Sequence, residues 1–181
     1  EDLQRELEDL QRAVAANPFQ TQKLPALWLT FQDVRLSLSS GVALVDFVRF
    51  NRFMKKGPRT PSYGAIIITA NGDPQWVPLG RADRIESLIN EYQLKTNTQK
   101  AVPDSEYEPI LRSLYNKLMG PVLQEMPKDT QTLIISPDGP LNFLSFATLL
   151  TEKNKFLCED YTIKYVSSGR DLIPFKKKRE N

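Results

Sequence analysis

Residues 133–147 read LIISPDGPLNFLSFA, which places a short β-branched run directly before a turn and an apolar segment. Thr132 to Ile135 has the composition of a buried strand, and Pro137-Asp-Gly139 is a typical turn sequence. The apolar residues from Leu141 to Leu150 predict a core helix, and Tyr161 to Val166 alternates as a strand does. This order of strand, turn, helix and strand is typical of an α/β domain.

A hairpin is predicted upstream of this segment. Tyr63 to Ala70 is an apolar run, Asn71-Gly72 is a strong hairpin signal, and Gln75 to Leu79 is the expected return strand. Because proline cannot donate a ladder hydrogen bond, Pro78 predicts that the return strand lies at a sheet edge or ends there. Val42 to Phe53 predicts another strand before the hairpin, since its β-branched and aromatic residues become alternating towards the end.

Two helices are predicted around the hairpin. A short helix within Pro25 to Ser40 takes Thr30 as its N-cap, and Gly41 closes it. Residues 81–95 repeat apolar side chains at helical spacing, which predicts an amphipathic helix.

A further helix is predicted from Tyr107 to Leu118, with Pro109 in its first turn, where the missing N–H costs little. Gly120-Pro121 is expected to punctuate it, with a further helical turn that contains Val122, Leu123 and Met126 left open as a continuation. Because helices interleave with strands after the hairpin, the predicted class is an α/β sandwich with a mixed sheet flanked by helices.

Residues 1–16 predict an N-terminal amphipathic helix. Its apolar stripe is made of Leu3, Leu7, Leu10 and Val14. Two interpretations remain open, a helix that packs on a preceding helix of a larger protein and a dimerising zipper. The stripe covers about two heptads, fewer than the three or four that indicate a coiled coil. Because the chain begins with Glu1 rather than methionine, we expect a piece of a longer protein in which residues 1–16 end a preceding helical region.

The composition is that of a globular domain, with 40% hydrophobic residues, 25% charged residues and a net charge of +2. The chain has no histidine and one cysteine, Cys158, so it cannot complete a Cys-His or Ser-His-Asp site or a disulfide framework. We expect no metal and no cofactor, because the glycines are scattered singly and form no phosphate-binding loop. A reducing, cytoplasmic location fits this composition. No apolar run approaches the roughly 18 residues that span a bilayer.

Single polar residues receive structural interpretations. Cys158 is expected to be a buried or half-buried structural cysteine, because no histidine is available to activate it. No serine lies in a Gly-x-Ser-x-Gly elbow, and Ser167-Ser168 is expected to cap a helix. Arg170 and Asp171 are interpreted as part of a solvated turn.

A basic run ends the chain and consists of Lys176, Lys177, Lys178 and Arg179. The run is short and belongs to a nearly neutral chain, so a solvated linker or tail over residues 176–181 is favoured over a nucleic-acid site.

The order of the motifs resembles the N-terminal part of a CHAT domain, a caspase-like domain often found behind tetratricopeptide repeats. The resemblance covers residues 28–173 and rests on segments 41–50, 63–69, 133–146, 161–165 and 167–172. Ser145 departs from it, because many relatives have proline there. The resemblance implies that residues 26–175 form the pseudo-protease half of this domain, since the family's catalytic histidine and cysteine lie in a later segment that the chain does not contain.

The implied function is that of a non-catalytic, structural and regulatory half of a cysteine endopeptidase. Its implied partners are the catalytic half of the same protein and the preceding helical repeats, without nucleic acid or membrane. The alternative is a non-enzymatic protein–protein interaction module. Because several caspase-like relatives cut after Arg or Lys, the basic run 176–179 is also a hypothetical maturation site.

Overall fold

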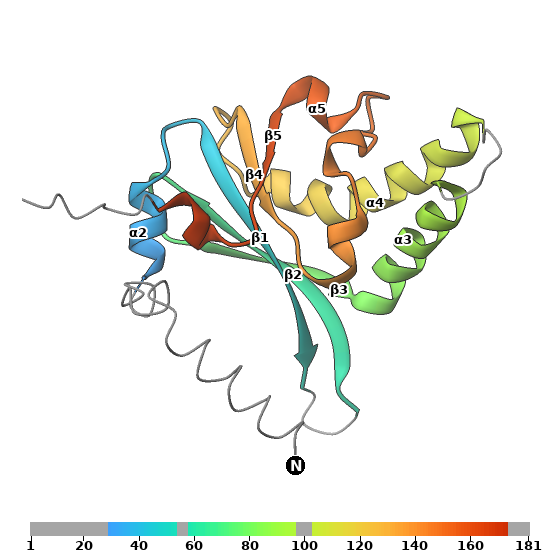
Figure 1. The fold of residues 1–181 in the computed structure, drawn as a ribbon, viewed down its shortest axis with the longest axis horizontal. Coiled ribbons are helices and arrows are strands. Elements are labelled where there is room, and N and C mark those ends of the chain that lie inside the picture. The colour runs from blue at the N-terminus through green and yellow to red at the C-terminus, as the bar shows by residue number, and fades with distance from the viewer. Residues whose placement is uncertain (1–28, 54–57, 97–102, 174–181) are drawn as a thin grey trace, which may run out of the picture. The chain divides into compact units, whose positions relative to one another are not determined.

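The computed structural model describes residues 29–53, 58–96 and 103–173. The helix predicted for residues 1–16 and the basic run 176–179 lie outside these residues. The described part contains a five-stranded sheet in the order β3-β2-β1-β4-β5 (Figure 1). The strands are β1 (Val42–Arg52), β2 (Thr60–Thr69), β3 (Gln75–Arg81), β4 (Thr132–Ser136) and β5 (Thr162–Tyr165). Strands β1, β4 and β5 are parallel, whereas β2 and β3 are antiparallel to their neighbours, so the predicted mixed sheet is confirmed.

Helices cover both faces of the sheet, as predicted for an α/β sandwich. The described helices are α2 (Phe31–Leu36), α3 (Ala82–Thr96), α4 (Asp104–Gln124), α5 (Leu157–Asp160), and the 3-10 turns η2 (Gly139–Phe143), η3 (Phe146–Thr148) and η4 (Gly169–Leu172). The long helices α3 and α4 lie with η2 and η3 on one face, and α2 lies with η4 on the other. No helix in the described part of the chain is both long and apolar enough to cross a membrane.

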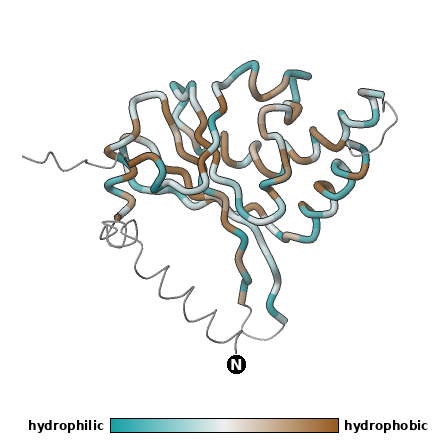
Figure 2. The backbone as a smooth tube through the Cα atoms, viewed as in Figure 1, coloured by the Kyte–Doolittle hydropathy of each residue, from teal (hydrophilic) through white to brown (hydrophobic). Residues whose placement is uncertain are grey.

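Alternation along the strands builds a separate core on each face. Odd-numbered residues of β1, such as Val45 and Phe47, belong to the larger core under α3 and α4. The ring of Phe47 packs 5.0 Å from that of Phe146, measured between centroids. Leu44, an even-numbered residue, belongs to the smaller core with Val34 of α2. Figure 2 shows these hydrophobic residues as brown segments along the central strands and on the helices beside them.

The predicted hairpin is confirmed as β2 and β3. Strand β3 is the last strand on its side of the sheet, so Pro78 lies in an edge strand as expected. The connection is longer than a two-residue turn, because the last paired residues are Ile67 and Gln75. Gly72 has a φ of 84° in this connection, a conformation that favours glycine.

The core helix predicted for Leu141 to Leu150 is wrong, because this segment forms η2 and η3 instead. Leu144, between the two turns, has an extended backbone. The buried side chains explain the difference, since Leu141 and Leu144 are three residues apart and so are Phe146 and Leu149. A three-residue period suits two short 3-10 turns better than one α-helix.

The break predicted at Gly120-Pro121 is also wrong, because α4 continues through it to Gln124. Leu118, Met119 and Val122 are fully buried around this point. Their packing outweighs the backbone hydrogen bond that proline removes. Pro109 likewise lies inside the helix rather than in its first turn, since α4 begins at Asp104.

Gly41 does not close the first described helix. Helix α2 begins at Phe31, directly after Thr30, but ends at Leu36. Gly41 has a φ of 75° and leads into β1, and its carbonyl accepts hydrogen bonds from the N–H groups of Gln131 and Thr132. Its conformation therefore aligns β1 with the start of β4.

Candidate functional site at the carboxyl edge of the parallel strands

The loops that follow β4 and β5 lie beside each other, because both strands are parallel and end at the same edge of the sheet. They border a shallow, open cleft with a volume of about 520 Å³. Its lining residues are Pro137, Asn142, Tyr165, Val166 and Ser167. Ligands of open α/β sheets bind outside the carboxyl ends of strands, so this cleft is the candidate functional site.

Hydrogen bonds tie the two sides of the cleft together. The buried Ser136 hydroxyl donates to the Ser167 carbonyl at 3.4 Å. The Tyr165 hydroxyl accepts from the Phe146 N–H at 2.9 Å, which joins the end of β5 to η3. These two hydrogen bonds therefore connect the end of β5 and the loop after it to β4 and to η3.

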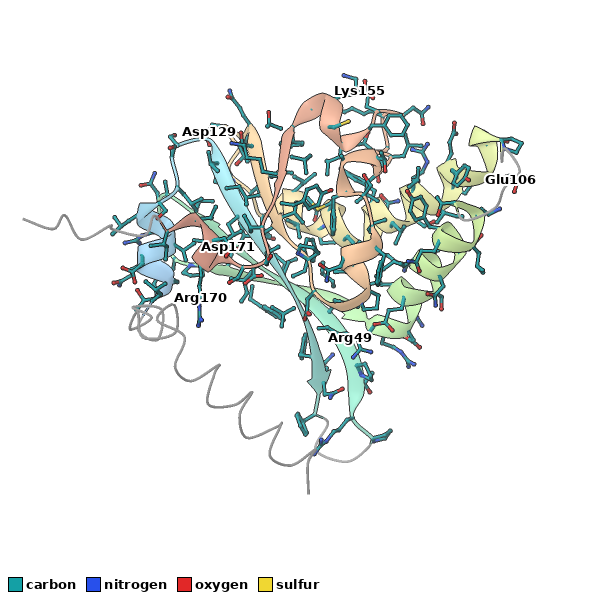
Figure 3. All side chains as sticks on the ribbon, viewed as in Figure 1. Arg49, Glu106, Asp129, Lys155, Arg170 and Asp171 are labelled. Carbon is teal, nitrogen blue, oxygen red and sulfur yellow. The ribbon has the colours of Figure 1, made fainter. Side chains whose placement is uncertain are left out.

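The loop after β5 is built around a helix cap. The Asp171 carboxylate accepts from the N–H groups of Ser167 at 2.9 Å and Ser168 at 3.1 Å. The Ser168 hydroxyl accepts from the Arg170 N–H at 3.3 Å, which confirms the predicted cap. Arg170 and Asp171 are exposed in this turn beside α2, where Figure 3 labels them. The sequence SSGRD thus has a structural role.

The loop after β4 is held by a polar network that reaches β1, β2 and α3. The backbone N–H of Arg49 donates to the Asp138 carboxylate at 2.8 Å. The Arg49 guanidinium (Figure 3) pairs with Glu86 of α3 at 2.7 Å, and the Tyr63 hydroxyl donates to the same Glu86 oxygen at 3.2 Å. Gly139 packs closely on this network, because an added Cβ would lie 3.3 Å from the Arg49 side chain.

Burial and the neighbouring Glu86 carboxylate favour the protonated form of the Tyr63 phenol. Burial raises the pKa of Tyr63 above its ordinary value of 10.0, and the neighbouring Glu86 carboxylate raises it further. The hydrogen bond to Glu86 raises the pKa of Arg49 as well. Both groups therefore act as permanent donors to Glu86, and the network positions the loop rather than exchanging protons.

Cys158 lies on α5 and is exposed, so the prediction of a buried or half-buried cysteine is wrong. The short helix buries Leu157 instead, and this turns the next side chain outward. Ser167, the serine that lines the cleft, has no histidine to activate it, and the nearby Asp171 carboxylate accepts hydrogen bonds from the backbone N–H groups of Ser167 and Ser168. Among the described residues, no three His, Cys, Asp or Glu side chains are grouped as metal ligands.

Comparison with protein families finds a match that covers the C-terminal part of the chain. The family model of the CHAT domain matches residues 108–181. Over this segment, which is less than half of its length, the chain is similar to the CHAT domain. The match begins in α4 and includes β4, β5 and both loops of the cleft. No curated protein and no solved structure matches the chain.

The CHAT match confirms the resemblance for the motifs at residues 133–146 and 161–172. The motifs at 41–50 and 63–69 lie outside the matched residues. They nevertheless form β1 and β2 of the same sheet, and β1 pairs directly with β4 of the CHAT segment.

Sequence reasoning missed the Arg49–Tyr63–Glu86 network. One signal was present, because Arg49 continues the core-facing series of Val45 and Phe47 along β1. A charged residue in such a series indicates a paired charge. Its partner Glu86 comes from another element, so spacing alone does not identify it.

The network predicts how stability depends on alkaline pH. Below about pH 10 the Tyr63 phenol is protonated in both the folded and the unfolded state. Above this pH the unfolded phenol ionises while the folded one stays protonated, so the free energy of unfolding falls as pH rises. We expect Tyr63→Phe to lose less stability than the wild type between about pH 9 and about pH 11, as measured by urea unfolding.

The free energy of unfolding of Tyr63→Phe at neutral pH serves as the reference for its alkaline slope. There, loss of the hydrogen bond to Glu86 is expected to lower the free energy of unfolding by about 1 kcal/mol. Burial also raises the pKa of Tyr115 and Tyr161, so the alkaline slope should shrink rather than vanish. An unchanged slope in Tyr63→Phe would contradict this account.

Proposed function

We propose that this chain is the non-catalytic, structural and regulatory half of a CHAT-type, caspase-like cysteine endopeptidase. The catalytic His–Cys pair is then supplied by a segment beyond residue 181. The observation that carries the proposal is the outer edge of β5, which has no partner strand among the described residues, beside a cleft in the CHAT-matched segment of a chain without histidine.

Strand β5 has one edge without a partner among the described residues. It ends the strand order of the described sheet, although parallel strands are usually covered and paired. Thr162 and Val166 donate their N–H groups to carbonyls of Gln131 and Ile135 on the β4 side. Alternation then directs the N–H groups of Ile163 and Tyr165 outward, where a further strand can accept them.

The proposed division of labour follows from the side chains. In a cysteine peptidase, a histidine assists the thiolate that attacks the scissile carbonyl. This chain has no histidine, so it contributes no base. A strand added to β5 extends the carboxyl edge, and its catalytic loop then lies next to the rigid loop that Asp171 caps. The described half thus serves as the support of the catalytic half.

The outer edge of β5 provides a direct test. The chain is co-expressed with the following segment of its parent protein, and their association is measured by co-purification. Tyr165→Pro removes an outward N–H, whereas Tyr165→Ala removes the same side chain and keeps that N–H. We expect association to be lost in Tyr165→Pro and largely kept in Tyr165→Ala. Equal association of the two variants would show that the halves do not pair through this edge.

A labelling experiment on the parent protein tests the activity. An Arg-directed, thiol-reactive peptide probe is expected to label a cysteine beyond residue 181 only. Labelling of Cys158 would overturn the assignment of the halves. Absence of labelling in every activated state would instead favour the alternative, a non-enzymatic interaction module.

The basic run 176–179 is proposed as a maturation site between the two halves, since it resembles sequences that basic-specific peptidases cut. The proposed partners are the catalytic half and preceding helical repeats, in the cytoplasm. Replacing Lys176, Lys177, Lys178 and Arg179 by glutamine is expected to keep the active parent protein as one band on a denaturing gel. If the wild type cuts its substrate while remaining one band, the run is not a maturation site.

A further inference from the structure

Among the described residues, helix and turn cover the second face of the sheet along only part of its length. Helix α2 and η4 cover Leu44, Ile68 and Ile134. Beyond them, β1 and β3 present an aromatic patch, which we define as Phe50, Arg52, Trp76 and Pro78 together with Phe53 and Arg59. Within the described chain, the smaller core includes none of these residues. Trp76 is 49% exposed and Phe53 is 71% exposed.

Within the aromatic patch, Phe50, Trp76 and Pro78 form an apolar corner. The rings of Phe50 and Trp76 meet edge to face, with centroids 5.5 Å apart and an angle of 65° between their planes. Gly64 permits this arrangement, because a Cβ at that position would overlap the Trp76 indole. The rings border a cavity of about 420 Å³ that Pro78 and Arg52 also line. The corner is therefore preformed and apolar, with a guanidinium at its border.

The charged side chains of the patch itself, Arg52 and Arg59, are both basic, and the one acidic residue of β1, Asp46, lies in register with Trp76 across Ile66 of β2. Residues 47–72 contain no Asp or Glu, and their basic residues are Arg49, Arg52, Lys55, Lys56 and Arg59. Arg49 is bound to Glu86 on the other face. Arg52 is exposed and has no ion pair within the described part of the chain, and Arg59 lies over the Phe53 ring at 4.8 Å. The patch thus combines apolar rings with cations available to an acidic partner.

Two other modes of binding fit this surface less well. Pro78 interrupts the outer edge of β3, which disfavours the addition of a further strand there. Single-stranded nucleic acid stacks successive bases on open ring faces, whereas Phe50 and Trp76 close a corner against each other. The geometry suits one apolar side chain flanked by carboxylates.

We infer that the aromatic patch is a docking surface for an extended acidic protein segment. A leucine-sized side chain of the segment enters the corner of Phe50, Trp76 and Pro78, and flanking Asp or Glu carboxylates pair with Arg52 and Arg59. This interaction does not depend on the proposed peptidase half, because it uses the second face of the sheet rather than its carboxyl edge.

The test uses the full chain of residues 1–181 and the synthetic peptide Gly-Asp-Glu-Leu-Asp-Glu-Gly, with binding measured by isothermal titration calorimetry. Arg52→Glu is expected to raise the Kd at least about tenfold, because it reverses a charge that faces the carboxylates. Lys128→Glu is the matched control, an exposed cation before β4, and should bind as the wild type does. Trp76→Ala should weaken binding as well, whereas Leu94→Ala, an exposed residue of α3, should not.

A spectroscopic measurement locates the peptide independently of the patch variants. The chain has two tryptophans, so in a Trp28→Phe background the emission comes from Trp76. Entry of the leucine should shift this emission to shorter wavelength, and a peptide with alanine in its place should not.

The following results would overturn the inference. Undetectable binding of the acidic peptide, or equal loss in Arg52→Glu and Lys128→Glu, would exclude a specific surface. Equal binding of the leucine and alanine peptides would exclude the corner as an anchor. Tighter, Arg52-dependent binding of an oligothymidine strand would identify a nucleic-acid surface instead.

Discussion

The structure depends on the pairing of β1 with strands of opposite direction on its two sides. Its antiparallel partner β2 and its parallel partner β4 are bonded to the same residues, from Ala43 to Asp46. This central position buries both faces of β1, so Val45 faces α3 and α4 while Leu44 faces α2. An error of one residue in this register would exchange the two cores. The single strand therefore links the hairpin to the CHAT segment.

Strand β1 also supports the loop that follows β4 at the carboxyl edge of the parallel strands. Strand β1 extends beyond the end of β4, and this brings Arg49 to the loop that contains Asp138. Glu86 then receives both the Arg49 guanidinium and the Tyr63 hydroxyl. The network uses two strands, a helix and a loop, so the cleft at β4 and β5 is supported by residues outside the matched CHAT segment.

The long β1–β2 pair also leaves a surface beyond the cover of α2 and η4. Trp76 rests over Gly64 there, and Arg52 follows Phe50 along β1. The two surfaces differ in chemistry, since the cleft at β4 and β5 is bordered by backbone-bonded polar loops and the aromatic patch by rings and guanidinium groups. They lie on different parts of the sheet.

Hydrophobic periodicity and turn residues were sufficient to predict the strands, the hairpin, the edge position of Pro78 and the Ser168 cap, because these depend on neighbours close in the chain. Local sequence signals failed for residues 141–150 and for the passage of α4 through Pro121, and the absence of an activating histidine did not predict the exposure of Cys158. In each case packing against distant elements decided the outcome, as with the fully buried Met119 and Val122. The Arg49–Glu86–Tyr63 network and the Phe50–Trp76 corner likewise join residues from separate elements. Such contacts arise only when the tertiary fold brings those elements together.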